Sequence, residues 1–278
     1  MGVLKKLVSW AAQSDPLWRV LDWTVLRAAR FAENERRRLM FDRRQAELVR
    51  HLFPDLTVRH GPFAGVQYPK AVAVCSALLP KLLGSYEREL HGALERACGR
   101  SYRVVVDVGC AEGYYAVGLA KRLPTTAIRA FDTDPAARSL CRAMAEANGV
   151  SGQVTIGEHC GPDQLREVVA GRQALVVCDC EGYELDLLTP AVVPALAASE
   201  ILVETHEFAG DKVADTLSGR FSATHKVEVV ASTDDAVKGR MYKYPELVPL
   251  TSADRDFVLA ERRPGVMEWL VLTPHCSR

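Results

Sequence analysis

The segment from Val104 to Tyr115 constrains the fold of this chain more than any other. It opens with four valines in five positions, a pattern typical of a strand that is buried on both faces of a parallel sheet. Gly109, Ala111 and Gly113 follow, and their small side chains let backbone N–H groups at the start of the next helix approach a ligand closely. The segment therefore predicts a nucleotide-type pocket, although an ordinary strand–helix connection has the same pattern of small residues.

Two acidic residues indicate which nucleotide such a pocket would hold. A dinucleotide motif needs a third glycine where this chain has Tyr114. Asp107, two residues before the first glycine, places a carboxylate near the turn, which repels phosphate and favours an ammonium group. S-adenosylmethionine carries an ammonium group and no phosphate. Asp132, at the end of the next predicted strand, is then expected to bind the ribose hydroxyl groups.

Composition limits the class of protein. With 278 residues, of which 48% are hydrophobic and 25% charged, the chain is expected to be an ordinary globular protein with one large domain and an extension, or with two small domains. It has 35 basic and 35 acidic residues, so a nucleic acid is not the expected partner of the whole chain. The eight cysteines form no CxxC pair, which predicts reduced thiols in a cytoplasmic protein.

Residues 1–53 are predicted to form three helical segments, because apolar residues recur at helical spacing after the start signal Ser14-Asp15-Pro16. Twelve basic and seven acidic residues occur up to His60. This surplus could form a patch for an anionic substrate, a membrane surface or a nucleic acid, but the interleaved acidic residues favour a solvated helix face. Neither a secretory signal nor a membrane-spanning stretch is expected.

A hairpin over residues 56–68 and a helix over residues 87–98, capped by Ser85, are predicted to follow. Together with the N-terminal helices they form a helical region of residues 1–100. This region directly precedes the first core strand, so we expect it to act as a lid over the pocket.

From residue 101 to residue 278 the pattern predicts one α/β domain with a doubly wound, mostly parallel, seven-stranded sheet, because strands alternate with helices and right-handed crossovers cover both faces. The last two strands are expected to form an antiparallel edge, separated by an irregular insertion near residues 232–266. The strands are predicted at 103–108, 127–132, 153–157, 174–179, 200–204, 225–231 and 268–273. The helices are predicted near 114–123, 135–148, 162–170, 184–197 and 211–219.

Ionisable side chains follow two of the predicted strands. Asp179 and Glu181 come after one strand, and Glu204 and His206 after its neighbour. Because parallel strands end at the same edge and residues two apart face the same way, the four groups should converge beside the pocket. Three interpretations remain open: a general base, with His206 or a carboxylate accepting a proton; a divalent metal site such as Mg²⁺, with Asp179 and Glu204 as possible ligands; and a satisfied polar strand end. We favour His206 as the base, because the neighbouring acids should orient the imidazole and make it more basic.

Several of these segments together resemble the FkbM-type S-adenosylmethionine-dependent methyltransferases. The resemblance covers roughly residues 100–210 and rests on Asp107-Val108-Gly109 with Gly113-Tyr114-Tyr115, Phe131-Asp132, Asp179-x-Glu181-Gly182-x-Glu184 and Leu202-Val203-Glu204. It implies a class I methyltransferase fold of the Rossmann-like kind. It also implies methylation of a hydroxyl group on a sugar or another natural product.

The predicted function is therefore O-methylation of a small-molecule hydroxyl group, with S-adenosylmethionine as the cofactor. Two alternatives are an N-methyltransferase and a non-catalytic cofactor-binding module whose basic helices bind a macromolecular partner. The acceptor site is expected to contain His206, Asp179, Glu181 and Glu204. The cofactor site is expected to contain Tyr86, Asp107, Gly109, Cys110, Glu112, Gly113, Asp132, Thr133, His159, Cys160 and Asp179.

Overall fold

The computed structural model describes residues 2–207 and 212–275, and the chain divides into two compact units, Met1–His51 and Leu52–Arg278. The division between the compact units therefore falls near residue 51, and residues 52–100 belong with the sheet. The first unit consists of helices, as the sequence predicted for residues 1–53. Its elements are α1 (Gly2–Ala11), α2 (Asp15–Leu21), a π-helical turn η1 (Asp22–Leu26) and α3 (Arg27–Leu52).

The second unit is built on a seven-stranded sheet with the order β3-β2-β1-β4-β5-β7-β6. The first five strands run parallel, and β7 pairs antiparallel with both β5 and β6. This confirms the predicted doubly wound, mostly parallel sheet with an antiparallel edge. The strands are β1 (Val104–Val108), β2 (Ala127–Phe131), β3 (Val154–Gly157), β4 (Ala174–Cys178), β5 (Glu200–Thr205), β6 (His225–Ala231) and β7 (Glu268–Pro274).

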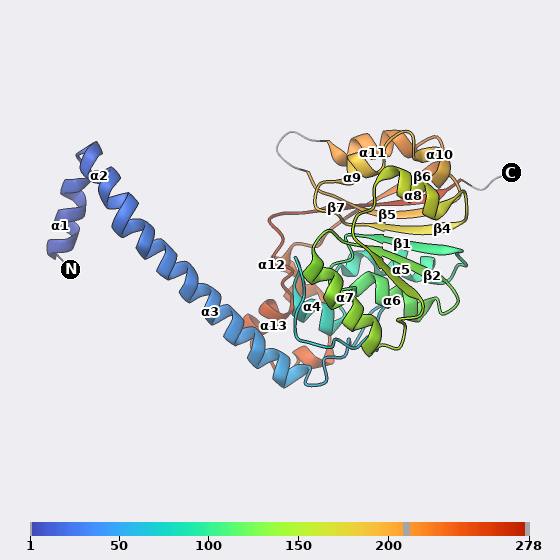
Figure 1. Ribbon diagram of the computed structural model, residues 1–278. Helices are drawn as coiled ribbons and strands as arrows, with labels where there is room; N and C mark the ends of the chain where they lie inside the picture. Colours follow the sequence, from blue (N-terminus) through green and yellow to red (C-terminus); the bar gives the residue numbers. More distant parts are fainter. Residues whose placement is uncertain (1, 208–211, 276–278) are drawn as a thin grey trace. The chain divides into compact units, whose positions relative to one another are not determined.

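Helices cover both faces of this sheet, with α5, α6 and α7 on one face and α8 to α11 on the other (Figure 1). Every residue of β1 and β4 is buried, as expected for central strands of a parallel sheet. The helices are α4 (Leu78–Leu83), α5 (His91–Cys98), α6 (Tyr114–Arg122), α7 (Pro135–Ala147), α8 (Pro162–Val169), α9 (Glu184–Leu187), α10 (Val193–Leu196), α11 (Val213–Phe221), α12 (Asp235–Met241) and α13 (Ser252–Leu259). All seven cysteines that the structure describes are free thiols.

The prediction of one helix over residues 184–197 is wrong, because the chain there forms two short helices, α9 and α10. Pro190 lies between them. It lacks a backbone N–H group and disfavours helical geometry at the residue before it, so a continuous helix is interrupted at this point.

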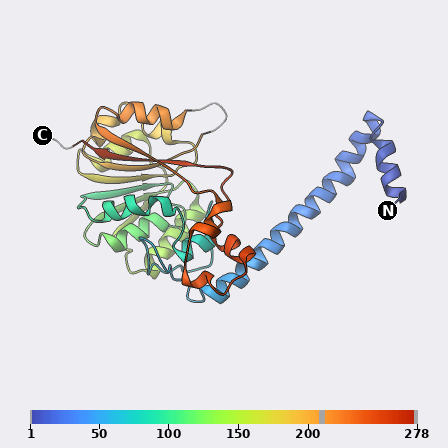
Figure 2. The same cartoon turned by 180° about the vertical axis from the view of Figure 1, so that it is seen from behind.

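The insertion near residues 232–266 is helical and not irregular as predicted. Asp234 accepts a hydrogen bond from the backbone N–H of Ala236 at the start of α12, and Thr251 accepts one from Asp254 at the start of α13. Asp and Thr are both residue types that favour the N-cap position of a helix. In both views α13 lies beside α4, so the insertion returns to the edge of the sheet where the parallel strands end (Figures 1 and 2).

The segment before β1 also departs from the prediction in two places. Leu78–Leu83 forms the helix α4, which ends at Gly84 in a left-handed conformation. Ser85 does not cap the next helix; its Oγ atom is buried without a hydrogen-bond partner, and a 3₁₀ turn η2 (Arg88–Leu90) leads into α5. The predicted hairpin is confirmed as a short one, with a single bridge between Thr57 and Gln67.

Candidate functional site

A cavity of about 480 Å³ lies at the carboxyl ends of β1 to β4 and is closed on one side by residues 74–86. Its position is the one expected for ligand sites in open parallel sheets. The structure places in its wall eight of the residues predicted to hold the cofactor, which are Tyr86, Gly109, Cys110, Asp132, Thr133, His159, Cys160 and Asp179.

The other three predicted cofactor residues lie behind this wall. Asp107 is buried in β1, where burial raises the pKa of its carboxyl group to about 7. Gly113 takes a left-handed conformation against Cys141 at the start of α6. Glu112 is buried and directed at the segment that closes the cavity.

Glu112 holds that segment in place. Its carboxylate forms an ion pair of 2.7 Å with Lys81 and accepts hydrogen bonds from the Tyr68 hydroxyl group at 3.1 Å and from the Val74 backbone N–H at 2.9 Å. Both charged side chains are almost completely buried. Since Val74 and Lys81 line the cavity, Glu112 organises the wall from behind and does not face the ligand space.

Gly109 joins the ends of two neighbouring strands. A Cβ atom at this position would lie 1.6 Å from the backbone oxygen of Asp179, so only glycine permits the turn after β1 to contact the turn after β4. The turn is fixed on its other side by Asp132, whose carboxylate accepts hydrogen bonds from the backbone N–H groups of Ala111 at 2.8 Å and Asp134 at 2.9 Å.

A second cavity of about 340 Å³ adjoins the first. The two share five lining residues, which are Cys75, Ser76, Tyr86, Asp179 and Glu181. The second cavity extends from these residues to the end of β5, with Glu204 and His206, and to Arg263 before β7. Asp179 and Glu181 therefore stand where the two spaces meet.

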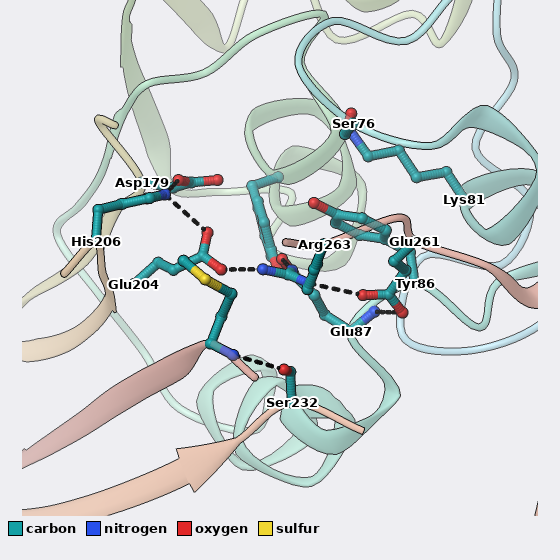
Figure 3. A network of polar contacts seen from close by, with 12 residues as sticks. Ser76, Lys81, Tyr86, Glu87, Asp179, Glu204, His206, Ser232, Glu261 and Arg263 are labelled. Carbon is teal, nitrogen blue, oxygen red and sulfur yellow. Dashed lines mark hydrogen bonds and ion pairs between the residues drawn. The ribbon is translucent and has the colours of Figure 1, made fainter. Parts of the chain in front are cut away.

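The four ionisable groups predicted to converge after β4 and β5 do converge, around the imidazole of His206. Figure 3 shows three of them, His206, Asp179 and Glu204. The Nε2 atom lies 3.6 Å from Asp179, 3.5 Å from Glu181 and 3.6 Å from Glu204. The Nδ1 atom lies 2.8 Å from Glu184 Oε1. Glu184 belongs to α9, has no exposed surface and was not among the predicted site residues.

The surroundings of His206 set its charge. Burial alone would lower the pKa of the imidazole, but the hydrogen bond with Glu184 and the charges of Asp179 and Glu204 raise it to about 9. Burial raises the pKa of Asp179 to about 6 and that of Glu204 to about 8. At neutral pH the imidazole is therefore a cation that faces an ionised Asp179, so His206 is a poor proton acceptor and Asp179 a better one.

A second cation, Arg263, lies on the other side of Glu204 (Figure 3). It forms ion pairs with Glu204 and Glu87, and its Nε atom lies 3.0 Å from Glu261. Sequence reasoning missed these groups. The sequence did contain a signal for them, which is the charged run 261–263 just before the last predicted strand. That strand is antiparallel, so its start pairs with the end of β5, with Thr205 opposite Glu268, and the run before it is brought to the site.

The metal interpretation has a geometric basis in the same residues. Ligand atoms of Asp179, Glu181 and His206 lie within 4.8 Å of one another. A metal ion would require a neutral imidazole, so metal binding and protonation of His206 exclude each other. Without a metal ion, the raised pKa of His206 favours the protonated imidazole, which supplies a positive charge among the carboxylates.

Comparisons with known proteins find partial similarities. Residues 90–178 match the family model Methyltransferase small domain. A ribosomal protein L11 methyltransferase from Pelotomaculum thermopropionicum is 35% identical over 99 residues, which are 36% of this chain and 30% of that protein. The chain thus spans less than a third of the length of the curated relative it matches. Both matches are to methyltransferases, and the family match covers the stretch that contains β1 to β4.

Two solved structures are similar more loosely. An O-methyltransferase from Bacillus cereus in complex with SAH shows 13% identity, covers 69% of this chain and 82% of its own, and has a TM-score of 0.41. The ribosomal protein L11 methylase from Lactobacillus delbrueckii subsp. bulgaricus shows 11% identity, 69% and 80% coverage, and a TM-score of 0.41. Likenesses this weak carry no argument about function.

Proposed function

We propose that this chain is an S-adenosylmethionine-dependent methyltransferase whose larger cavity holds the cofactor and whose smaller cavity holds the acceptor. The observation that carries the proposal is the charge of the larger cavity. The carboxylates in its wall are Asp132, Asp134, Glu158, Asp179 and Glu181. The single lysine or arginine among the described residues of the wall, Lys81, is paired with Glu112. Such a wall suits a sulfonium and an ammonium group and opposes a pyrophosphate.

Asp132 is proposed to bind the ribose. Each carboxylate oxygen already accepts one backbone hydrogen bond and keeps a second lone pair for a hydroxyl group. His159 and Cys160, which line the cavity after β3, are proposed to contact the adenine. Tyr86, Asp179 and Glu181 lie at the opening to the second cavity and would surround the methionine part of the cofactor.

Asp179 is proposed as the group that removes the proton from an acceptor hydroxyl group. It lines both cavities, and a pKa of about 6 leaves it ionised at neutral pH. Its Oδ1 atom lies 3.6 Å from His206 Nε2 and has no hydrogen-bond partner among the described residues. His206 is proposed to hold Asp179, Glu181 and Glu204 in place as a fixed cation. The resemblance to FkbM-type enzymes supports a hydroxyl acceptor of the sugar or natural-product kind.

A second candidate is methylation of an amine. The smaller cavity is lined by five acidic side chains, those of Asp179, Glu181, Glu204, Glu207 and Glu261, and by three basic ones, those of His206, Arg262 and Arg263. The excess of acidic side chains favours a cationic acceptor. The name of the relative with 35% identity describes methylation of a ribosomal protein, so a protein amine is one form that such an acceptor could take.

Binding calorimetry tests the cofactor. We expect S-adenosylmethionine to bind the full chain and NAD not to bind, because the carboxylates repel its phosphates. Asp132→Ala should weaken S-adenosylmethionine binding by about 1–3 kcal/mol through loss of charge-assisted hydrogen bonds. The matched control is Asp163→Ala, which changes an exposed carboxylate on α8. Tight NAD binding would overturn the proposal, and equal affinity in both variants would remove Asp132 from the ribose site.

Turnover assays separate the remaining alternatives. Release of S-adenosylhomocysteine should depend on an added acceptor. Panels of polyols and of primary amines, assayed side by side, decide between O- and N-methylation. A chain that binds the cofactor and produces no S-adenosylhomocysteine with either panel or with a macromolecular extract would be the non-catalytic binding module.

A further inference from the structure

The N-terminal helices expose far more apolar surface than the rest of the chain. Among the described residues, nine of the fifteen exposed large hydrophobic side chains belong to the first unit, although that unit is less than a fifth of the sequence. Scattered exposed hydrophobic residues are normal, whereas a dense group marks a binding surface. Six of the nine lie in α1, α2 and η1, which are Val3, Leu7, Trp10, Leu17, Trp23 and Val25.

The exposed large hydrophobic residues of helix α1 lie on one side of the helix. Val3, Leu7 and Trp10 follow one another at spacings of four and three, so they form a single stripe along the helix. They are 76%, 56% and 61% exposed. At the helical repeat of about 100° per residue, Lys5 lies on the opposite side of the helix and Lys6 lies at one flank of this stripe. The helix is therefore amphipathic, with an apolar face that the first unit leaves uncovered.

The tryptophans of the chain are also concentrated in the N-terminal helices. Three of the four tryptophans of the chain, Trp10, Trp18 and Trp23, occur within the first 23 residues. The fourth, Trp269, is completely buried in the sheet domain. An exposed indole combines an apolar ring with a polar N–H group, which suits the boundary between water and lipid.

The charge of this region points to one kind of partner. Up to Phe31 the chain carries five basic residues, namely Lys5, Lys6, Arg19, Arg27 and Arg30. It carries only two acidic residues there, Asp15 and Asp22. Asp22 is already paired with Arg30 at 2.8 Å. The segment that carries the exposed apolar face therefore has an excess of positive charge, which an anionic surface would neutralise.

We propose that α1, α2 and η1 bind the interface of a membrane rich in anionic lipids, with Val3, Leu7 and Trp10 inserted among the headgroups. No helix among the described residues is long and apolar enough to cross a membrane, so the binding is peripheral. A second copy of the chain fits less well, because it would bring two regions of the same positive charge together. A nucleic acid would leave Val3 and Leu7 without an apolar partner.

Vesicle sedimentation with the full chain tests this surface. The probes are vesicles of phosphatidylcholine alone and vesicles with 30% phosphatidylglycerol as an added anionic lipid. The full chain should bind the anionic vesicles at least tenfold more tightly than the neutral ones, with a blue shift of tryptophan fluorescence and weaker binding at high salt. Leu7→Ser with Trp10→Ser should reduce this binding at least tenfold.

A matched control removes exposed apolar surface elsewhere. Val248→Ser changes a side chain that is 73% exposed in the sheet domain, and it should leave vesicle binding unchanged. S-adenosylmethionine binding and circular dichroism report whether each variant is folded, independently of the membrane readout. Equal binding to both vesicle types, or full binding by the double variant, would overturn the proposal. A dimer that the double variant abolishes, without any vesicle binding, would assign the face to a second copy and equally overturn it.

Discussion

The Oε1 atom of Glu184 lies 2.8 Å from the Nδ1 atom of His206, at the buried end of an imidazole whose other nitrogen faces three carboxylates. Because α9 supplies Glu184 and β5 leads directly to His206, the contact ties two elements of the sheet domain together. It also fixes which nitrogen faces the acceptor cavity. The contact with Glu184 stabilises the protonated imidazole, so the histidine acts as a charged group and not as a base.

This contact predicts an unusual titration. In the full chain, the imidazole of His206 should titrate near pH 9, because Glu184, Asp179 and Glu204 stabilise its charged form beyond the opposing effect of burial. Glu184→Gln removes one of these charges and should lower the midpoint. Nuclear magnetic resonance of the imidazole proton measures both values. His225 is the first residue of β6, and burial lowers its pKa; its titration should not change, so it serves as the control. A wild-type midpoint at or below 6.5 would contradict the assignment of His206 as a fixed cation.

Asp179 should control the dependence of turnover on pH. Its carboxylate must be ionised to accept a proton, so activity should rise with pH through a midpoint near 6 and then level off. Asp179→Asn should lower turnover by about 10²- to 10⁴-fold, as expected for loss of a general base. Asp186→Asn, which changes an exposed carboxylate on α9 that lines neither cavity, should have no effect. Normal turnover by Asp179→Asn would show that the acceptor needs no base at this position.

Chelation distinguishes this mechanism from a metal-dependent one. We expect activity to survive EDTA, because the imidazolium of His206 already provides a positive charge among Asp179, Glu181 and Glu204. Turnover is measured before and after dialysis against the chelator, with calorimetric cofactor binding as the control for folding. Loss of activity in EDTA that Mg²⁺ or Mn²⁺ restores would assign Asp179, Glu181 and His206 as ligands instead.

The sequence carried enough information for the sheet and for one half of the site. Strand positions follow from runs such as the valines of β1, and Asp132 and Asp179 follow from their places at strand ends, because both signals are local in the chain. Glu87 and Arg263 could not be found in this way. They meet although 176 residues separate them in the sequence, and only the packing of the segments before β1 and β7 brings them together.

Glu112 shows a different limit. Its place in the glycine-rich turn predicted contact with the cofactor, and the turn does line the cavity. The side chain, however, points to the opposite side of the turn, where Lys81 and the Val74 backbone N–H donate hydrogen bonds to its carboxylate oxygens. A local motif predicts where the backbone runs, but the direction of one side chain depends on partners from distant segments.

The pair of Lys81 and Glu112 should matter for stability far more than an exposed pair. Lys81→Met leaves the carboxylate of Glu112 buried without its cation and should lower the free energy of unfolding by about 3–5 kcal/mol. Adding Glu112→Leu should recover part of this loss, because no uncompensated charge remains, while the Tyr68 hydroxyl group and the Val74 N–H lose their acceptor. Arg37→Ala breaks an exposed pair with Glu33 and should cost less than about 1 kcal/mol. Urea denaturation measures all three variants, and equal losses for the buried and exposed pairs would contradict this account.

Asp107 should make the fold less stable as pH rises. Burial raises the pKa of its carboxyl group from 3.8 to about 7, so the folded chain holds a proton that the unfolded chain releases between these values. Stability therefore falls from about pH 4 to about pH 7 and does not change further above pH 7 through this group. Asp107→Asn removes this titration. The difference in free energy of unfolding between the variant and wild type should therefore shift by a few kcal/mol in favour of the variant between about pH 4 and pH 8. Urea denaturation at pH 4.5 and pH 8 measures this difference, and Asp163→Asn, at an exposed carboxylate, should show none. A variant that is less stable than wild type by the same amount at both pH values would show that the carboxyl group of Asp107 does not change its charge in the fold.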